Sequence, residues 1–272
     1  MAKKQRTKKK TALMILAGII LFLLVQWVFI GWRFNFGPFK PLGRIRLAGL
    51  AGNAEQYDFS RIEPAADGPL EGKTVLFLGS SVTNGEAALN QSIPEYFAAR
   101  LGCSSIREAV DGTTLTDNGK SSYVQRLLNN VDTAQKVDLL ICQLSTNDAS
   151  KEMPLGAIAE GTAIEDFDAA TITGAMEYII AYAKETWDCP VVFYTNARFD
   201  STPYAAMVAR LYELEEKWGI GVLDLWNDEA FNDITETQRA LYMKDSIHPV
   251  KAGYRDWWGP ELERQLMEFL CR

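Results

Sequence analysis

The sequence predicts an α/β fold, in which a parallel β-sheet is covered by helices on both faces and follows a single membrane-spanning helix. Two observations carry this prediction. From about residue 73 onward, short apolar segments rich in β-branched residues alternate with segments of helical length, as in sheets whose parallel strands are joined by helices. Near the N-terminus, residues 12–30 contain no charged side chain.

The chain begins with a predicted membrane anchor. As a helix, the apolar run 12–30 spans roughly 28 Å, which is enough to cross a bilayer core. A cleaved signal peptide is the alternative, but its apolar region is usually shorter, and here Trp27 and Trp32 lie at interfacial depth. We therefore predict an uncleaved transmembrane segment over residues 11–32.

The charges that flank this segment predict its orientation. Every charged residue in the basic tail 1–10 is Lys or Arg, whereas the basic residues that follow the span are fewer and more widely spaced. Because positive charge is retained on the cytoplasmic side, the tail is expected in the cytoplasm and residues 33–272 outside it. The predicted localisation is a single-pass membrane protein with its folded domain outside the cytoplasm.

The remainder divides into a linker and one domain. Residues 33–72 mix Gly, Pro and charged residues without sustained periodicity, which is typical of a tether and a lead-in to a folded domain. Residues 73–272 show no internal repeat, and their number is sufficient for a single hydrophobic core.

Five strands are predicted, each a short apolar run bounded by turn residues. The first is followed by Gly79 and then by two serines. The strands are Thr74–Leu78, Ser105–Val110, Val137–Leu144, Pro190–Thr195 and Gly219–Leu225.

Five helices are predicted between and after these strands. In the third, apolar residues from Ala175 to Ala183 recur at helical spacing, and the last contains Tyr254, Trp257 and Trp258, an aromatic cluster expected in the core. The helices are Ile93–Leu101, Ser121–Asn130, Thr171–Thr186, Pro203–Trp218 and Lys251–Leu270.

Composition excludes some functions. Beyond the first ten residues, 22 basic side chains face 35 acidic ones, a formal charge of −13. Such an acidic body is unsuited to nucleic acid, which is bound through clustered Lys and Arg. Among four cysteines, Cys142 lies in an apolar strand and is expected as a buried small side chain, while a Cys103–Cys189 disulfide cannot be deduced.

Residues capable of chemistry collect where the predicted strands end. Ser80 and Ser81 follow the first strand, and the chain's single histidine, His248, lies three residues after Asp245 near the start of the last helix. In a parallel sheet these positions meet at one edge. An imidazole activates a serine hydroxyl, and a carboxylate holds the ring in the required tautomer. Taken alone, an Asp-x-x-His pair is equally typical of a helix start.

Donors for an oxyanion are placed at the same edge. The serine at the strand-to-helix turn offers its backbone N–H, Gly112 follows the second strand, and Asn147 follows the third. Individually, Gly112 is equally typical of a turn and Asn147 of a helix cap. Their joint placement after consecutive strands favours the functional interpretation.

These segments resemble, in order, the four motif blocks of the SGNH/GDSL hydrolase family. The matching blocks are Phe77–Gly85, Glu108–Thr114, Gln143–Asp148 and Asp245–Pro249. The resemblance implies Ser81 as nucleophile, Asp245 and His248 as the rest of a triad, and an oxyanion hole formed by Ser81, Gly112 and Asn147. It also implies a three-layer α/β/α sandwich with a five-stranded parallel sheet, a flavodoxin-like arrangement.

Two positions depart from the family pattern. The usual Gly-Asp-Ser is Gly79-Ser80-Ser81 here, and Ser145 occupies the glycine position of the usual Gly-x-Asn-Asp. Neither departure removes a catalytic group. Ser80 cannot make the charged contacts of an aspartate, and Ser145 lacks the backbone freedom of glycine.

Other enzyme classes fit less well. An α/β-hydrolase elbow needs a glycine two residues after its serine, where this chain has Thr83. One histidine is too few for a typical catalytic zinc site, and no glycine-rich nucleotide motif opens a helix, so neither a metal nor a cofactor is expected.

The expected activity is hydrolysis of carboxylic esters by a membrane-tethered enzyme. Short acyl or O-acetyl groups, on small molecules or on cell-envelope carbohydrate, are favoured because residues 73–272 contain no long apolar lid segment. A lipid esterase or lysophospholipase at the membrane surface, and a catalytically silent binding module on the same fold, are the alternatives. The sequence leaves the oligomeric state open.

Overall fold

The computed structural model describes residues 2–34, 37–66 and 68–271 of a chain that divides into two compact units, Met1–Leu50 and Ala51–Arg272. In the first unit, α1 (Ala2–Phe34) precedes the short α2 (Lys40–Ala48). The segment Lys8–Arg33 of α1 is long and apolar enough to cross a membrane, and its most apolar 18-residue window has a mean hydropathy of 2.8. Arg46 of α2 donates to Trp32 O (3.0 Å) and Arg33 O (3.3 Å), so its guanidinium caps the carbonyl end of α1.

The second unit contains the sheet. Its five strands are all parallel and lie in the order β2-β1-β3-β4-β5, which confirms the predicted five-stranded parallel arrangement. Their bounds are β1 Thr74–Gly79, β2 Ser104–Ala109, β3 Leu139–Gln143, β4 Val191–Tyr194 and β5 Gly221–Leu223.

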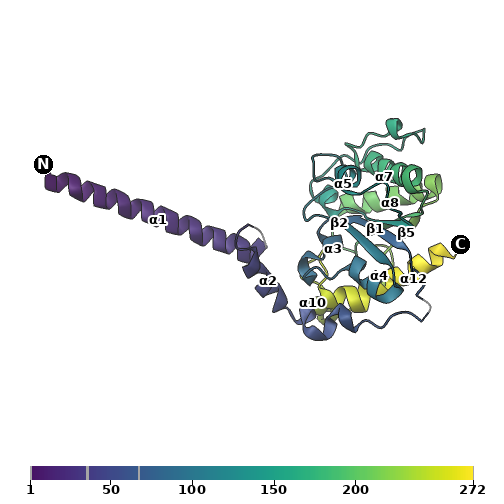
Figure 1. Ribbon diagram of the computed structural model, residues 1–272, viewed down its shortest axis with the longest axis horizontal. Coiled ribbons are helices and arrows are strands. Elements are labelled where there is room, and N and C mark those ends of the chain that lie inside the picture. Colours follow the sequence, from purple (N-terminus) through teal and green to yellow (C-terminus); the bar gives the residue numbers. More distant parts are fainter. Residues whose placement is uncertain (1, 35–36, 67, 272) are drawn as a thin grey trace. The chain divides into compact units, whose positions relative to one another are not determined.

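Helices cover both faces of this sheet (Figure 1), as the three-layer prediction requires. On one face lie α5 (Tyr123–Asn130), α7 (Ile172–Trp187) and α8 (Thr202–Trp218), and on the other lie α4 (Ile93–Leu101) and α12 (Gly259–Leu270). Shorter helices occupy the connections. They are α3 Ser81–Asn84, α6 Thr146–Ser150, α9 Glu229–Asn232, α10 Glu236–Tyr242 and α11 Lys251–Gly253, with single turns η1 Ala51–Asn53, η2 Glu55–Tyr57, η3 Phe59–Arg61, η4 Glu86–Ala88, η5 Ile164–Asp166 and η6 Tyr254–Trp258.

Two hydrophobic cores lie against the sheet. Successive residues of a strand point to opposite faces, so Leu76 and Leu78 of β1 pack with α5, α7 and α8, whereas Val75 and Phe77 pack with α4 and α12. Most side chains of β1 and all of those in β3 are buried, which explains why both strands are recognisable from continuous apolar sequence.

The structure differs from the sequence prediction in three places. The predicted helix 251–270 changes to π geometry over η6 before it continues as α12. The short helices α3, α6, α9 and α10 were not predicted, because a few residues do not establish a 3.6-residue period. Regular packing begins at Ala51 rather than near Lys73, and Phe59 and Leu70 of the supposed lead-in are buried.

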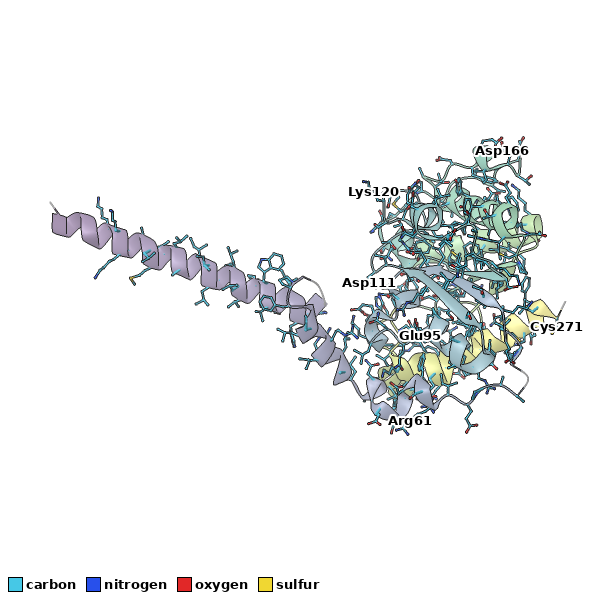
Figure 2. The ribbon with its side chains drawn as sticks, in the orientation of Figure 1. Arg61, Glu95, Asp111, Lys120, Asp166 and Cys271 are labelled. Atoms are coloured by element: carbon cyan, nitrogen blue, oxygen red, sulfur yellow. The ribbon has the colours of Figure 1, made fainter. Side chains whose placement is uncertain are left out.

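All four cysteines lie among the described residues and none is paired, so the Cys103–Cys189 disulfide that the sequence left open is not formed. Cys142 is buried in β3, as expected. Cys271, near the C-terminus, is exposed (Figure 2).

Candidate active site

Ser81 lies at a tight turn between β1 and α3. A Cβ on Gly79 would lie only 1.7 Å from Thr83 Oγ1, so only glycine allows α3 to begin this close to the strand. Ser80 is the residue before the helix, with φ −119° and ψ −140°, and Ser81 opens the first turn. The Ser81 N–H therefore has no carbonyl partner within its own helix and can donate elsewhere.

The structure brings Ser81, His248 and Asp245 together. Ser81 Oγ lies 2.9 Å from His248 Nε2, although the two residues are 167 positions apart. On the other side of the ring, His248 Nδ1 lies 2.9 and 3.0 Å from the two carboxylate oxygens of Asp245. With its proton on Nδ1, the imidazole donates to Asp245 and accepts from the Ser81 hydroxyl.

Hydrogen bonds keep the Asp245 carboxylate charged. Its partial burial opposes ionisation, but the His248 ring and the backbone N–H groups of Ile247 and His248 donate to it and hold its pKa well below the usual value. The same bonds fix the carboxylate within a tight turn. It is therefore a rigid acceptor for the imidazole at neutral pH.

Gly112 and Asn147 lie beside the serine turn. Gly112 has φ +76°, a left-handed conformation that glycine adopts without strain. Asn147 Nδ2 donates to Ser80 Oγ (3.1 Å) and to Thr113 O (3.0 Å), so its amide joins the serine turn to the residue after Gly112. Asn147 thus contacts the residue before Ser81 and the residue after Gly112, and its amide already has partners.

Gln143, at the end of β3, supports the serine turn. Its Oε1 accepts from Ser80 N (2.9 Å), Thr83 N (3.2 Å) and Thr83 Oγ1 (2.8 Å), and it is fully buried. The sequence pattern predicts no role for Gln143. What marks it is an amide side chain at the end of an otherwise apolar strand, because a buried polar group needs specific hydrogen-bond partners.

Asp148 and Arg126 support the neighbouring loops. Burial raises the pKa of Asp148, and its carboxylate accepts from Leu115 N (2.7 Å) and Thr116 N (3.1 Å), which ties the Gly112 loop to α6. Arg126 of α5, 3% exposed, donates to Gly79 O (2.7 Å) and Glu108 O (2.6 Å) at the ends of two strands. In the sequence, Arg126 is marked as indirectly as Gln143, by being a single charged residue on the buried face of a helix.

Three polar side chains lie near Gly112: Asp111 and Lys151 are exposed and Asn84 is partly buried, while the apolar Val110 is also exposed. Asn84, one helical turn after Ser81, donates to Asp111 Oδ1 (2.7 Å), and Lys151 Nζ donates to Gly112 O (2.8 Å). Figure 2 shows Asp111 at the surface of the molecule. Hydroxyl-rich ligands are bound by carboxylates, amides and ammonium groups of this kind.

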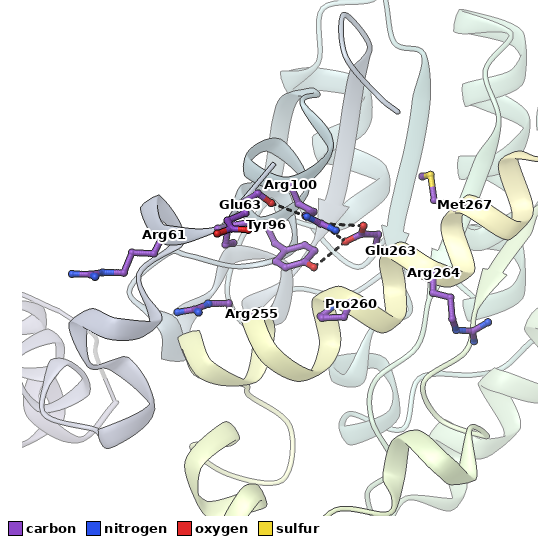
Figure 3. A pocket seen from close by; sticks show the side chains of 10 residues that line it. Arg61, Glu63, Tyr96, Arg100, Arg255, Pro260, Glu263, Arg264 and Met267 are labelled. Atoms are coloured by element: carbon purple, nitrogen blue, oxygen red, sulfur yellow. Dashed lines mark hydrogen bonds and ion pairs between the residues drawn. The ribbon is translucent and has the colours of Figure 1, made fainter. Parts of the chain in front are cut away.

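A separate cavity of about 550 Å³ lies between η3, α4 and the last helix (Figure 3). Neither Ser81 nor His248 lines it. Glu263 accepts from Tyr96 Oη (3.0 Å) and Arg100 Nε (3.1 Å) across this cavity, so these side chains satisfy one another. We therefore place no part of the ester chemistry there.

Comparison with known proteins assigns the chain to a family. Residues 77–255 match the profile of the GDSL-like lipase/acylhydrolase family, which covers more than half of the chain. No curated protein matches it.

Solved structures share the fold at low identity. A protein from Lactobacillus plantarum is 21% identical with a TM-score of 0.59, covering 74% of this chain and 97% of its own. A G-D-S-L family protein from Desulfitobacterium hafniense is 18% identical with a TM-score of 0.55, covering 71% and 99%. An acetyl xylan esterase is 15% identical with a TM-score of 0.52, covering 70% and 98%.

The family match covers every block that sequence analysis singled out, from the strand before Ser81 to the residues after His248. The five-stranded parallel sheet agrees with the shared fold. The chain belongs to the GDSL-like lipase/acylhydrolase family and is an ester hydrolase of the SGNH type.

Proposed function

We propose that this chain is a membrane-tethered serine hydrolase that removes short acyl or O-acetyl groups through Ser81, His248 and Asp245. The contact of 2.9 Å between Ser81 Oγ and His248 Nε2 carries the proposal. A hydroxyl is a weak nucleophile until a base takes its proton, and His248 is the only histidine of the chain.

The reaction has two steps. His248 Nε2 takes the Ser81 proton as Oγ attacks the ester carbonyl, and the imidazolium, stabilised by Asp245, then gives that proton to the leaving alcohol. This leaves an acyl group on Ser81. In the second step His248 deprotonates a water molecule, which attacks the acyl-enzyme, and the proton returns to Ser81 as the carboxylic acid leaves.

The tetrahedral intermediate needs hydrogen-bond donors for its oxyanion. We assign this role to the N–H groups of Ser81 and Gly112 and to Asn147 Nδ2. Because both N–H bonds of the Asn147 amide have partners, Ser80 Oγ and Thr113 O, the oxyanion replaces one of them as the intermediate forms. Asn147 therefore donates more strongly to the charged intermediate than to the neutral ester, which is the selectivity that catalysis requires.

Two observations support carbohydrate as the alcohol part of the substrate. Asn84, Asp111 and Lys151 give the surroundings of Gly112 a polar character. One structure with the same fold is an acetyl xylan esterase. The exposed apolar helix α1 favours a second candidate, a lipid ester at a membrane surface.

The anchor is part of the proposal. The span within Lys8–Arg33 has no buried residue in its most apolar window, and the preceding residues carry only positive charge. We infer that α1 is retained in the membrane, with the tail 1–10 in the cytoplasm and the hydrolase outside.

Purified full-length protein in detergent tests the activity. Wild-type protein should hydrolyse p-nitrophenyl acetate, whereas Ser81→Ala and His248→Ala should lower kcat by about ten-thousandfold with unchanged circular dichroism. Ser80→Ala should cost much less, because Ser80 Oγ contacts Asn147 rather than His248.

The substrate is tested separately with esters of increasing chain length and with acetylated polysaccharide. Release of acetate from polysaccharide supports the carbohydrate assignment, and a preference for long acyl chains supports the lipid candidate. A protein that hydrolyses none of these esters, or a His248→Ala variant that retains most activity, would falsify the proposed mechanism.

A further inference from the structure

Ser81 and His248 belong to loops that are distant in the sequence, so their contact depends on how those loops are held together. Among the described residues, an ion pair and a hydrogen bond link the two loops directly. Lys244 Nζ forms an ion pair with Glu86 (2.6 Å), and Tyr254 Oη donates to Val82 O (2.7 Å). A third segment, residues 51–61, also contacts both loops, and we call it the strap.

Asn53 of the strap joins the two loops with one side chain. Its Nδ2 donates to Ala87 O (2.8 Å), in the turn that follows the Ser81 helix. Its Oδ1 accepts from Lys251 N (3.0 Å), three residues after His248. The side chain is 5% exposed, so both bonds are shielded from water and each fixes a backbone atom.

Asp58 repeats this bridge at the other end of the strap. Its carboxylate accepts from Gln91 Nε2 (2.8 Å), beyond the Ser81 loop, and from Lys251 Nζ (2.9 Å), beyond His248. Gln91 Oε1 in turn accepts from Phe59 N (3.0 Å). Lys251 is thus held by the strap through both its backbone and its side chain.

The strap packs closely against the residues that flank His248 in sequence. A Cβ on Gly52 would lie 2.1 Å from Leu241 O and 2.3 Å from Val250 Cγ2, so the backbone approaches within a distance that no other residue permits. The loop that follows Ser81 contains a strained turn, since Leu89 and Asn90 both have positive φ, and such a turn persists only where surrounding contacts hold it.

We propose that the strap positions the catalytic pair. Asn53 and Asp58 hold the loop after Ser81 and the segment after His248 in the register that gives the Oγ–Nε2 contact. This inference rests on the proposed function, because the contact between Ser81 and His248 affects activity only if these two residues catalyse the reaction. It makes Asn53 and Asp58 positioning residues for the catalytic pair, within a segment that the sequence predicts as a tether.

The test compares variants of full-length protein in detergent. Asn53→Ala removes both bridging bonds. Asp58→Asn removes the charge that Lys251 faces and leaves one amide oxygen in place of two carboxylate oxygens, of which Oδ1 accepts from Ser60 N and Oδ2 accepts from Gln91 and Lys251. Glu55→Gln is the matched control, since its carboxylate lies in the same segment, is 88% exposed and pairs only with Arg61 among the described residues. Each variant is assayed well below its own unfolding temperature.

We expect Asn53→Ala and Asp58→Asn to lower kcat for p-nitrophenyl acetate about tenfold or more with little change in KM, because small displacements of reacting groups are costly. The rate at which a serine-directed phosphonate labels Ser81 should fall in parallel. Glu55→Gln should match wild type in both measurements. If Asn53→Ala does not fold, Asp58→Asn alone decides the outcome.

A lower unfolding temperature with unchanged kcat and labelling rate in both variants would overturn the positioning role and leave a structural one. Ser81→Ala and His248→Ala are assayed in the same series. If those two retain activity, the proposed function fails. If they are inactive while the strap variants equal the Glu55→Gln control, the strap inference fails by itself.

Discussion

At the scale of single residues, the side-chain amide of Gln143 stabilises the Gly-Ser-Ser turn. It accepts from two backbone N–H groups that flank Ser81 in sequence, Ser80 N and Thr83 N. A buried N–H without a partner costs about 1–3 kcal/mol, so the acceptor stabilises one conformation of the turn against others.

Gln143→Leu should therefore lower both activity and stability. The substitution keeps a side chain of similar size but leaves Ser80 N and Thr83 N without an acceptor, which predicts about 2–4 kcal/mol of destabilisation and a fall in kcat. Ester hydrolysis and thermal unfolding of the full chain measure the two effects. Gln135→Leu, the same change at an exposed site, should alter neither. Normal kcat in Gln143→Leu would show that the turn is held by other contacts.

The sequence allowed some of these residues to be predicted. Ser81 and His248 are recognisable as candidates because serine at a strand end and a lone histidine are local signals, and the structure places them in contact. Gln143 and Asn53 are not recognisable in this way, because their roles depend on distant partners. Asn53 and Lys251, for example, are 198 positions apart. A pattern of hydrophobicity carries no information about such contacts.

At the scale of elements, the strands were predictable and the strap was not. Continuous apolar runs identify β1, β3 and β4, whose buried side chains face helices on both sides. The strap consists of single turns such as η3, where Asp58 caps the N-terminus by accepting from Ser60 N. Polar side chains rather than apolar periodicity stabilise these turns, so the sequence pattern predicts a linker here.

The ion pair between the strap and α11 makes stability depend on pH. Hydrogen bonds from Lys251 and then Gln91 lower the pKa of Asp58 well below its usual value. A carboxylate with a depressed pKa in the folded state stabilises the fold above its unfolded pKa of about 4, and this contribution is lost as the pH falls through the folded value.

Asp58→Asn should consequently lower the unfolding temperature most at neutral pH. The two side chains are 27% and 9% exposed, and breaking a pair of this kind predicts about 1–2 kcal/mol at pH 7, a difference that shrinks only as the pH falls below about 4 toward the depressed folded-state pKa. Thermal unfolding followed by tryptophan fluorescence at pH 7, 4 and 2 measures the difference. A gap between the two proteins that is as large at pH 2 as at pH 7 would rule out the ion pair as its source.

At the scale of the whole molecule, a basic apolar segment precedes an acidic hydrolase. Six of the 28 basic residues lie among the first ten positions, which contain no acidic residue, while the chain as a whole carries a formal charge of −7. The hydrolase unit begins at Ala51 and has its own two cores, so its folding does not require burial of α1. The exposed apolar surface of α1 is then available to lipid.

The cysteines provide a direct test of the topology. Among the described residues, Cys271 is exposed and Cys103, Cys142 and Cys189 are buried. A membrane-impermeant maleimide should therefore label Cys271 in intact bacterial spheroplasts that express the full-length chain, and Cys271→Ser should abolish the label. A cysteine placed in the tail by Lys9→Cys, in the Cys271→Ser background, should react only after permeabilisation, because the positive tail is retained in the cytoplasm. Labelling of Cys271 only after permeabilisation would reverse the orientation, and a soluble product lacking the first 30 or so residues would identify the segment as a cleaved signal peptide.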